Sequence, residues 1–283
     1  MIRALQAPVG MTVELGAMVA DAAMAERYWL LIGCPSPRLD RLPLGLALTL
    51  RGGPLPDVEL DADTVSFHAG HTLAAAQPFT SGRRYRARGR IAEIFEKSGR
   101  SGLLTVIARS AELLDEAGAL VVTIREQQIV RRRVPAATPP LVHPAHAAPP
   151  AAGPRADDEL EIGALIAVEH RAAPEAALVG ASAAALGGGE PPFFSDAGAA
   201  RLLGFADVIV PGPIQSALFE ALLAGRLPAW ELAELSLTFR VSLIAGEAIT
   251  LLALVTEIDD QPRRLTLDLT LENSRGERAA VGT

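Results

Sequence analysis

A strand pattern that occurs twice, roughly 160 residues apart, constrains the fold of this chain more than any other feature. Residues 82–94 (GRRYRARGRIAEI) and 246–258 (GEAITLLALVTEI) have the same length, begin with glycine and end in Glu-Ile. Each is followed by a turn, a strand, a second turn with glycine (Gly118 or Gly276) and a last strand. This spacing is too long for a solenoid repeat. The sequence therefore predicts two similar α+β units, each built on an antiparallel meander.

The segment between the two repeats is rich in proline. Seven of the 21 residues from Val134 to Pro154 are proline, which excludes a helix or central strand and favours an extended linker. We expect an N-terminal domain at 1–133, a Pro/Ala-rich linker at 134–157 and a C-terminal domain at 158–283. His143 and His146 lie in this linker and are interpreted as solvated, because no further metal ligand is nearby in sequence.

Hydrophobic periodicity predicts the strands of the C-terminal half. Apolar residues alternate with polar ones in 235–243 and 265–271, as in half-buried strands, whereas 249–258 is apolar on both faces and should be central. The segments 259–262 and 273–276 have turn composition. These three strands are expected to form the meander.

A buried helix is predicted just before the meander of the C-terminal half, but not before that of the N-terminal half. In the C-terminal half it is capped by Gly212, has Pro213 in its first turn, and is stopped by Gly225 and Pro228. In the N-terminal half a helix is predicted earlier, at about 18–32, and only a short helical turn fits just before the meander.

Composition and charge exclude several classes of protein. Hydrophobic residues make up 49% and charged residues 21%, so most of the chain is not intrinsically disordered. The net charge is −7; residues 1–133 carry 17 basic and 14 acidic side chains and residues 158–283 carry 8 and 18, which argues against a nucleic-acid partner. The most apolar run, 241–258, is interrupted by Glu247, and the N-terminus lacks a signal pattern. We expect a cytoplasmic protein without a membrane partner.

Few residues are available for metal or thiol chemistry. The single cysteine, Cys34, excludes a disulfide scaffold and has no histidine nearby in sequence, so it is not favoured as a nucleophile. With five histidines in the chain, we expect neither a metal site nor a cofactor.

Two groups of motifs resemble the MaoC-like hydratase and dehydratase superfamily. Phe194-Ser195-Asp196, Ala200, Gly204-Phe205 and residues 209–213 (IVPGP) resemble, in order and spacing, its His-x-Asp, Ala, Gly-Phe and Ile-Ala-His-Gly signature. Residues 67–71 (FHAGH), 77–79 (QPF), Gly82 and 97–102 (KSGRSG) resemble the N-terminal dehydratase domain of the same proteins. The resemblance covers nearly the whole chain. It implies an α+β double hotdog fold: two antiparallel sheets, with a full central helix in the C-terminal half only.

The resemblance implies an acyl-thioester (enoyl-CoA) hydratase or dehydratase homologue with a degenerate or atypical active site. Family members use an aspartate and a histidine five residues apart, but these positions fall on Gly189 and Phe194, and Pro211 replaces the histidine of the His-Gly pair. The alternatives are a non-catalytic acyl-CoA-binding or scaffolding subunit of a hotdog complex, and a hotdog thioesterase. Whether the protein is an enzyme is left open by the sequence.

The same resemblance places a binding site at the start of the central helix, where backbone amides would hold the thioester carbonyl. It implies substrate contacts from Phe194, Ser195, Val210, Gly212, Pro213 and Gln215, in a site between the halves. The missing N-terminal helix would leave an apolar tunnel for an acyl chain. The expected partners are an acyl thioester of coenzyme A or a carrier protein, and a second hotdog subunit in a homodimer or mixed pair. We expect Gly212→Leu to abolish ligand binding and leave the fold largely intact.

Three further sites have two interpretations each. Asp196 is a candidate catalytic base, or else either Ser195 or Asp196 caps a short helix at 197–203. His68, which with His71 flanks Gly70 at a strand start, is a candidate catalytic residue or a hydrogen-bonded turn residue. Arg84, Arg86, Arg88 and Arg90 form one face of a strand, which is either solvated or attracts the phosphates of coenzyme A. The candidate phosphate contacts are Arg84, Arg86 and Arg88.

Overall fold

A computed structural model describes residues 2–30, 41–49, 53–99, 102–132, 160–185, 192–261 and 263–283 of the chain. The chain divides into two compact units. Unit 1 contains Met1–Tyr28, Arg38–Val134 and Leu232–Ser236, and unit 2 contains Trp29–Pro37, Pro135–Glu231 and Leu237–Thr283. The proline-rich linker, including His143 and His146, lies outside the described residues, so its extended conformation stays a prediction.

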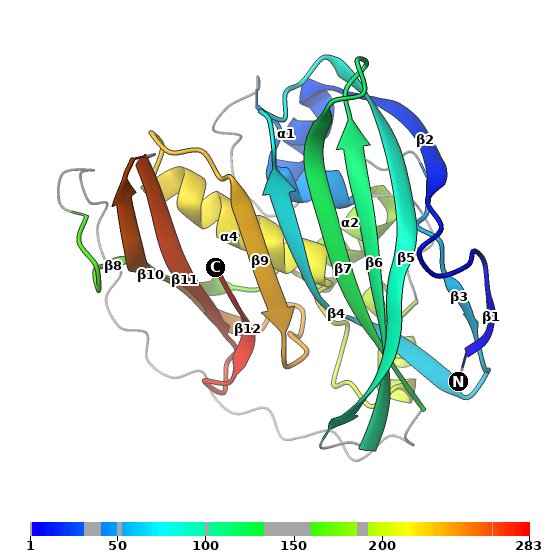
Figure 1. The fold of residues 1–283 in the computed structure, drawn as a ribbon. Coiled ribbons are helices and arrows are strands. Elements are labelled where there is room, and N and C mark those ends of the chain that lie inside the picture. Colours follow the sequence, from blue (N-terminus) through cyan, green and yellow to red (C-terminus); the bar gives the residue numbers. More distant parts are fainter. Residues whose placement is uncertain are drawn as a thin grey trace. The chain divides into compact units, whose positions relative to one another are not determined.

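Unit 1 is built on an antiparallel sheet whose strand order is β2-β5-β6-β7-β4 (Figure 1). Its strands are β2 (Val13–Ala20), β4 (Thr64–Ala75), β5 (Arg83–Gly99), β6 (Gly102–Leu114) and β7 (Leu120–Arg132). β5, β6 and β7 follow one another in the chain and pair in that order, which confirms the predicted meander. A separate two-stranded ribbon joins β1 (Ile2–Leu5) to β3 (Val58–Leu60).

Side chains of β5 alternate between the two faces of this sheet as the sequence predicts. Tyr85, Ala87 and Ile91 are buried, and the arginines between them are exposed. On the inner face, Ile91 packs with Ile107 and Val130 of the neighbouring strands. The outer face is therefore basic and the inner face holds the core.

Only short helices accompany this sheet in the part of unit 1 that the structure describes. η1 (Leu44–Leu48) is a buried helical turn that contacts β4 and β7. α1 (Ala22–Leu30) lies between β2 and η1 in the chain. The helix predicted for 18–32 is wrong at its start, because Met18–Ala20 pair with β5 as the end of β2 and Asp21 then caps α1 through a hydrogen bond from Met24 N.

Unit 2 repeats the same strand order with different residues. Its sheet runs β9-β12-β11-β10-β8 (Figure 1). The bounds are β8 (Leu165–Ala172), β9 (Glu234–Phe239), β10 (Ala248–Asp260), β11 (Arg263–Glu272) and β12 (Arg278–Gly282). Each strand thus has a counterpart in unit 1, and even the register shift in β5 after Ile91 recurs in β10 after Val255.

The first predicted strand of this half needs two corrections. It ends at Phe239 instead of Leu243, and it pairs with β12 instead of β10. Leu243 is fully buried, but it lies in a loop after the strand. The Leu243 carbonyl oxygen accepts a hydrogen bond from Val210 N (2.8 Å). Leu243 is therefore apolar because this loop is packed into the core. The alternation of apolar and polar residues continues past the end of the strand, which is why the strand was predicted too long.

The full central helix lies in unit 2, as expected. α4 (Gly212–Arg226) is buried along most of its length and contacts β8. Its N-cap is Pro211, not Gly212, and it continues through Gly225 to Arg226. Three shorter helices precede it: α2 (Ala176–Ala185), η3 (Pro192–Phe194) and α3 (Ala197–Leu202). Among the described residues, no helix has the length and apolar character needed to cross a membrane.

Candidate functional site

The start of α4 presents the backbone N–H of Gly212, which lies between two prolines. Pro211 is extended (φ −66°, ψ 154°), and its carbonyl accepts from Ile214 N (3.1 Å) and Gln215 N (3.2 Å). Gly212 is the first helical residue, so its N–H has no intrahelical acceptor, and Pro213 has no N–H. The positive end of the helix dipole lies at the same place. The arrangement suits a carbonyl or anionic oxygen.

Gly212 is buried against the ring of Phe239. A Cβ atom added at Gly212 would lie 2.5 Å from Cε2 and 2.8 Å from Cζ of that ring. Both distances are shorter than real Cβ contacts allow, so the ring would have to move. This close approach counts against the expectation that Gly212→Leu leaves the fold intact, which stays a prediction.

Gln215 places a polar group in the first turn of α4. Only 3% of this residue is exposed, and its Nε2 donates to Val210 O (3.0 Å). Its Oε1 is buried and has no hydrogen-bond partner in the part of the chain that the structure describes. A buried acceptor of this kind is expensive to leave unpaired. It is suited to an N–H or O–H of a ligand.

Phe194, at the position of the family's histidine, belongs to an apolar cluster. The rings of Phe193 and Phe194 lie 4.6 Å apart, and Phe193 packs with Ala200 and Ile209. Phe194 is half-buried beside this cluster and carries no group that transfers a proton. Gly189, at the aspartate position, lies outside the described residues.

Asp196 and Ser195 face solvent at the start of α3. Asp196 is the N-cap, and its Oδ1 accepts from Ala199 N (2.7 Å), which confirms the capping interpretation. Ser195 Oγ donates to Pro192 O (3.3 Å). Both side chains are exposed. The catalytic interpretation of Asp196 therefore stays a prediction with no geometric support in its favour.

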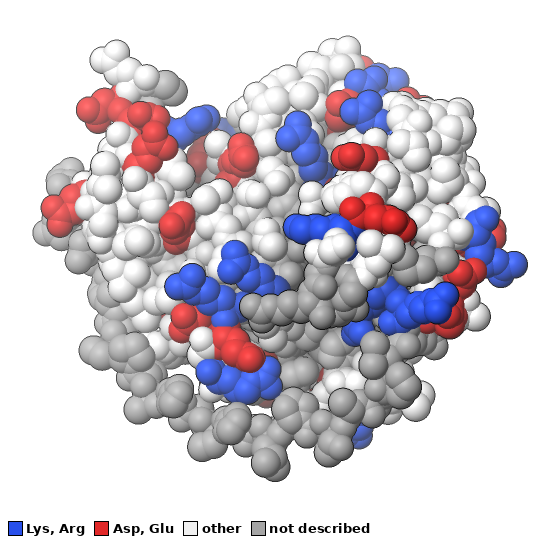
Figure 2. Space-filling view, turned by 60° about the horizontal axis from the view of Figure 1, so that its bottom comes forward, with Lys and Arg blue, Asp and Glu red and all other residues white. Residues whose placement is uncertain are grey.

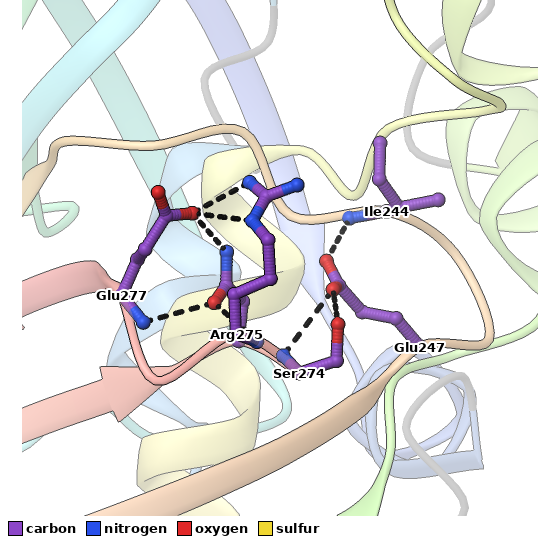
Figure 3. Close-up of polar contacts among 6 residues, drawn as sticks. Ile244, Glu247, Ser274, Arg275 and Glu277 are labelled. Carbon is purple, nitrogen blue, oxygen red and sulfur yellow. Dashed lines mark hydrogen bonds and ion pairs between the residues drawn. The ribbon is translucent and has the colours of Figure 1, made fainter. Parts of the chain in front are cut away.

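A polar network anchors the loop that holds the start of α4 (Figure 3). Glu247 accepts from Ile244 N (2.6 Å) through one carboxylate oxygen and from Ser274 Oγ (2.8 Å) through the other. Ile244 in turn forms a β-bridge with Ile209, next to Val210. Glu247 thus connects the β11–β12 turn to the residues that enter α4.

The second half of this network closes the β11–β12 turn. Glu277 accepts from Asn273 Nδ2 (2.9 Å) and from Arg275 Nε (2.8 Å) (Figure 3). These hydrogen bonds, first from Asn273 and then from Arg275, hold the pKa of Glu277 below its usual range. Gly276 adopts φ 72°, which this turn requires and glycine allows.

The structure brings His68 and His71 together in unit 1. They lie within β4, not at its start, and a β-bulge falls between His68 and Gly70. Residues three apart on a regular strand point to opposite faces, but the bulge puts both histidines on one face. Nδ1 of His71 lies 3.0 Å from Nε2 of His68, and the rings are perpendicular.

Two buried charged residues next to His71 were not anticipated from the sequence. His71 lies opposite Glu126 of β7, which lies opposite Arg109 of β6. Their exposed fractions are 3%, 7% and 3%. The hypothesis of an apolar tunnel assumed an apolar inner face in unit 1, but this face also carries buried charged residues. The sequence did offer a signal for these residues: Arg109 in β6 and Glu126 in β7 are charged residues at inward-facing positions of strands.

The predicted coenzyme A phosphate residues Arg84, Arg86 and Arg88 lie on the exposed outer face of β5. Arg88 forms an ion pair with Glu112 (2.6 Å), and Arg90 donates to Ser110 Oγ (3.2 Å). On the molecular face drawn in Figure 2, basic and acidic side chains are likewise interspersed. The phosphate-binding role of these arginines stays a prediction.

Within the described ranges, no three His, Cys, Asp or Glu side chains gather in a way that could hold a metal ion. Cys34 lies outside these ranges.

The fold of this chain is the double hotdog fold, and solved structures that resemble it include proteins described as MaoC-like dehydratases. A structure described as a MaoC-like dehydratase matches with a TM-score of 0.75 and 14% identity over 98% of both chains. HtdX of Mycobacterium tuberculosis matches with a TM-score of 0.63 and 19% identity over 96% of this chain and 98% of its own. Another Mycobacterium tuberculosis protein, described as having a double hotdog fold, matches with a TM-score of 0.58 and 15% identity over 98% and 94%.

Comparison by sequence gives no match, either to a family model or to a curated protein. The likeness therefore lies in the fold, and it confirms the fold that the sequence motifs implied.

Proposed function

We propose that this chain is a MaoC-like acyl-thioester (enoyl-CoA) hydratase/dehydratase homologue that binds an acyl thioester at the start of α4 and lacks the family's acid/base dyad there. The observation that carries the proposal is what the start of α4 offers: the Gly212 amide and the unpaired Gln215 Oε1 are suited to a ligand, whereas Phe194, at the position of the family's histidine, carries no transferable proton. Binding groups are present, and the usual proton-transfer groups are not.

The acyl thioester as ligand fits both polar groups of this helix start. Its carbonyl oxygen is an acceptor for the Gly212 amide, and an amide N–H of a pantetheine arm is a donor for Gln215 Oε1. Coenzyme A and carrier proteins both supply such an arm. A homodimer or a pair with another hotdog subunit is the assembly we propose for the protein.

A non-catalytic binding or scaffolding role is the second candidate, and the apolar packing of Phe194 with Phe193 favours it. The thioesterase alternative would use Asp196 as the base. It is less supported, because Asp196 is exposed and its carboxylate caps α3.

Calorimetric titration with a non-hydrolysable acyl-CoA analogue tests the proposal. We expect saturable binding by the full chain, weakened at least tenfold by Gln215→Leu, which removes the buried acceptor and keeps the volume similar. Gln261→Leu, in the exposed turn after β10, is the matched control and should bind like the original chain. Absence of binding, or equal binding by Gln215→Leu, would refute this site.

A further inference from the structure

Glu247 occupies a position that the duplicate in unit 1 fills with a different kind of residue. Gly246 and Gly82 precede β10 and β5 with nearly the same φ angle, 75° and 76°. The next residue is the half-buried Glu247 in unit 2 and the exposed Arg83 in unit 1. The repeated strand therefore does not require a carboxylate here. In the part of the chain that the structure describes, the full helix α4 is what unit 2 has and unit 1 lacks.

The carboxylate of Glu247 ties the loop before β10 to the β11–β12 turn (Figure 3). Oε1 accepts from Ile244 N (2.6 Å), in the loop. Oε2 accepts from Ser274 Oγ (2.8 Å) and from Ser274 N (3.4 Å), in the turn. Hydrogen bonds to a charged group are stronger than those between neutral groups. Glu247 therefore holds Ile244 at a fixed place relative to the turn.

The loop held by Glu247 pairs with the segment that enters α4. On one side of Ile244, Val210 N donates to Leu243 O (2.8 Å). On the other side, Ala245 N donates to Val208 O (2.9 Å). The two segments therefore form a short antiparallel pair around the β-bridge of Ile244. A displacement of the loop would move Val210, which lies two residues before α4 begins.

The carbonyl of Val210 sets the orientation of the Gln215 side chain. Gln215 Nε2 donates to this carbonyl (3.0 Å), so Oε1 is the end of the amide that has no hydrogen-bond partner among the described residues. The torsion that exchanges the two ends of a glutamine amide is broad, so this hydrogen bond decides which end is presented. If Val210 moved, Gln215 would be able to present Nε2 in place of Oε1.

We infer that Glu247 is a positioning residue of the acyl-thioester site at the start of α4. Through residues 243–245 and the Val210 carbonyl, it keeps Gln215 Oε1 available as an acceptor for a donor group of the ligand. The carboxylate of Glu247 is bonded to two other parts of the chain, so it acts on the ligand only through Gln215. This inference rests on the proposed function, which supplies the ligand.

Calorimetric titration of the full chain with the non-hydrolysable acyl-CoA analogue tests this role. Glu247→Ala removes both anchors and should weaken binding about tenfold. Glu247→Gln keeps an acceptor for Ile244 N and an amide that can bond to Ser274 Oγ, so its affinity should stay within about twofold of the original. The matched control is Asp115→Ala. Half-buried Asp115 accepts from Ala119 N (2.8 Å) in the corresponding turn of unit 1, and its loss should leave the affinity unchanged.

A double-mutant cycle separates positioning from a general loss of structure. In a Gln215→Leu background, Glu247→Ala should change the affinity less than about twofold, because the side chain through which it acts is already gone. A residue that only supports the fold would weaken binding by the same factor in both backgrounds. Equal factors in the two backgrounds therefore overturn the inference.

Hydrogen exchange in the ligand-free protein gives a second readout. We expect the Val210 N–H, followed by NMR, to exchange about tenfold faster in Glu247→Ala than in Asp115→Ala, since its acceptor Leu243 lies in the loop that Glu247 holds. Unchanged exchange overturns the inference. If Glu247→Ala fails to fold, Ser274→Ala takes its place: it removes one anchor only, and it should still speed this exchange and weaken binding.

The outcomes also separate this inference from the proposed function. Binding that is weakened in Gln215→Leu but not in Glu247→Ala overturns the role of Glu247 and leaves the proposed function standing. Absence of binding by the original chain refutes the proposed function, and the role of Glu247 at that site is refuted with it.

Discussion

Nε2 of His68 and Nδ1 of His71 lie 3.0 Å apart because a β-bulge between them turns both rings to the same face of one strand. Without the bulge, residues three apart would lie on opposite faces of the sheet. Unit 2 achieves the same strand order with apolar inner residues, so the histidine pair distinguishes the two halves of a duplicated fold.

The buried residues Arg109 and Glu126, which lie opposite each other on β6 and β7, should be easier to replace together than one at a time. Arg109→Leu leaves Glu126 buried without its cross-strand cation, and we expect a loss of about 3 kcal/mol in the free energy of unfolding. Arg109→Leu combined with Glu126→Leu should recover part of that loss, because the double variant no longer leaves a buried carboxylate without its cross-strand cation. Urea unfolding of the two variants measures the difference. A double variant less stable than Arg109→Leu would contradict this reasoning.

The ring of Phe239 packs against Gly212 and leaves little room for a side chain there. We expect Gly212→Ala to destabilise the protein by about 1–3 kcal/mol, since its Cβ would lie 2.5 Å from the ring. Gly225→Ala in the same helix has open space and should be neutral or stabilise by up to about 1 kcal/mol. Thermal unfolding of both variants tests this contrast, and equal melting temperatures would show that Phe239 does not restrict Gly212.

Asp196 should matter as a helix cap and not as a base. Asp196→Ala should cost about 1 kcal/mol by removing the hydrogen bond from Ala199 N, whereas Asp196→Asn keeps an acceptor and should cost little. Both variants should retain the original chain's rate on acyl thioesters. Loss of activity in Asp196→Asn, with stability preserved, would instead assign it a role in catalysis.

Glu277 should make the folded protein less stable as the pH falls. Asn273 and Arg275 lower its pKa in the folded state, so its contribution is present above the ordinary glutamate pKa and is lost as pH falls through the lowered value. We expect Glu277→Gln to destabilise by at most about 1 kcal/mol at pH 7, because the side chain is 48% exposed, and the difference should disappear as the pH falls below the lowered pKa. Glu257→Gln, which removes a long hydrogen bond from Thr266 (3.4 Å), is the control. A difference that grows toward acid pH would have the wrong sign.

The strands were predictable because their alternation is local, and their pairing was less so. The segments 249–258 and 265–271 fall inside β10 and β11. That β9 pairs with β12 could not be read from the sequence, since the pairing depends on contacts between distant segments. Met18–Ala20 were assigned to a helix for the same reason: their place is fixed by pairing with β5.

The candidate site was predictable only where it lies on a recognisable motif. The α4 start followed from the IVPGP segment, and the loss of the dyad followed from Gly189 and Phe194. The packing of Phe239 on Gly212 depends on the fold and could not be predicted from the sequence. The placement of His71 opposite Glu126 could not be predicted, because the β4 bulge changes which face each residue occupies.

The hydration rate of crotonyl-CoA, measured for the purified chain beside a MaoC-like dehydratase that retains both dyad residues, tests the central claim most directly. A general acid or base contributes about 10²–10⁴-fold in rate, so the loss of the dyad predicts hydration at least 10²-fold slower than the dyad-bearing enzyme. Turnover by this chain alone at the rate of the dyad-bearing enzyme would contradict the account.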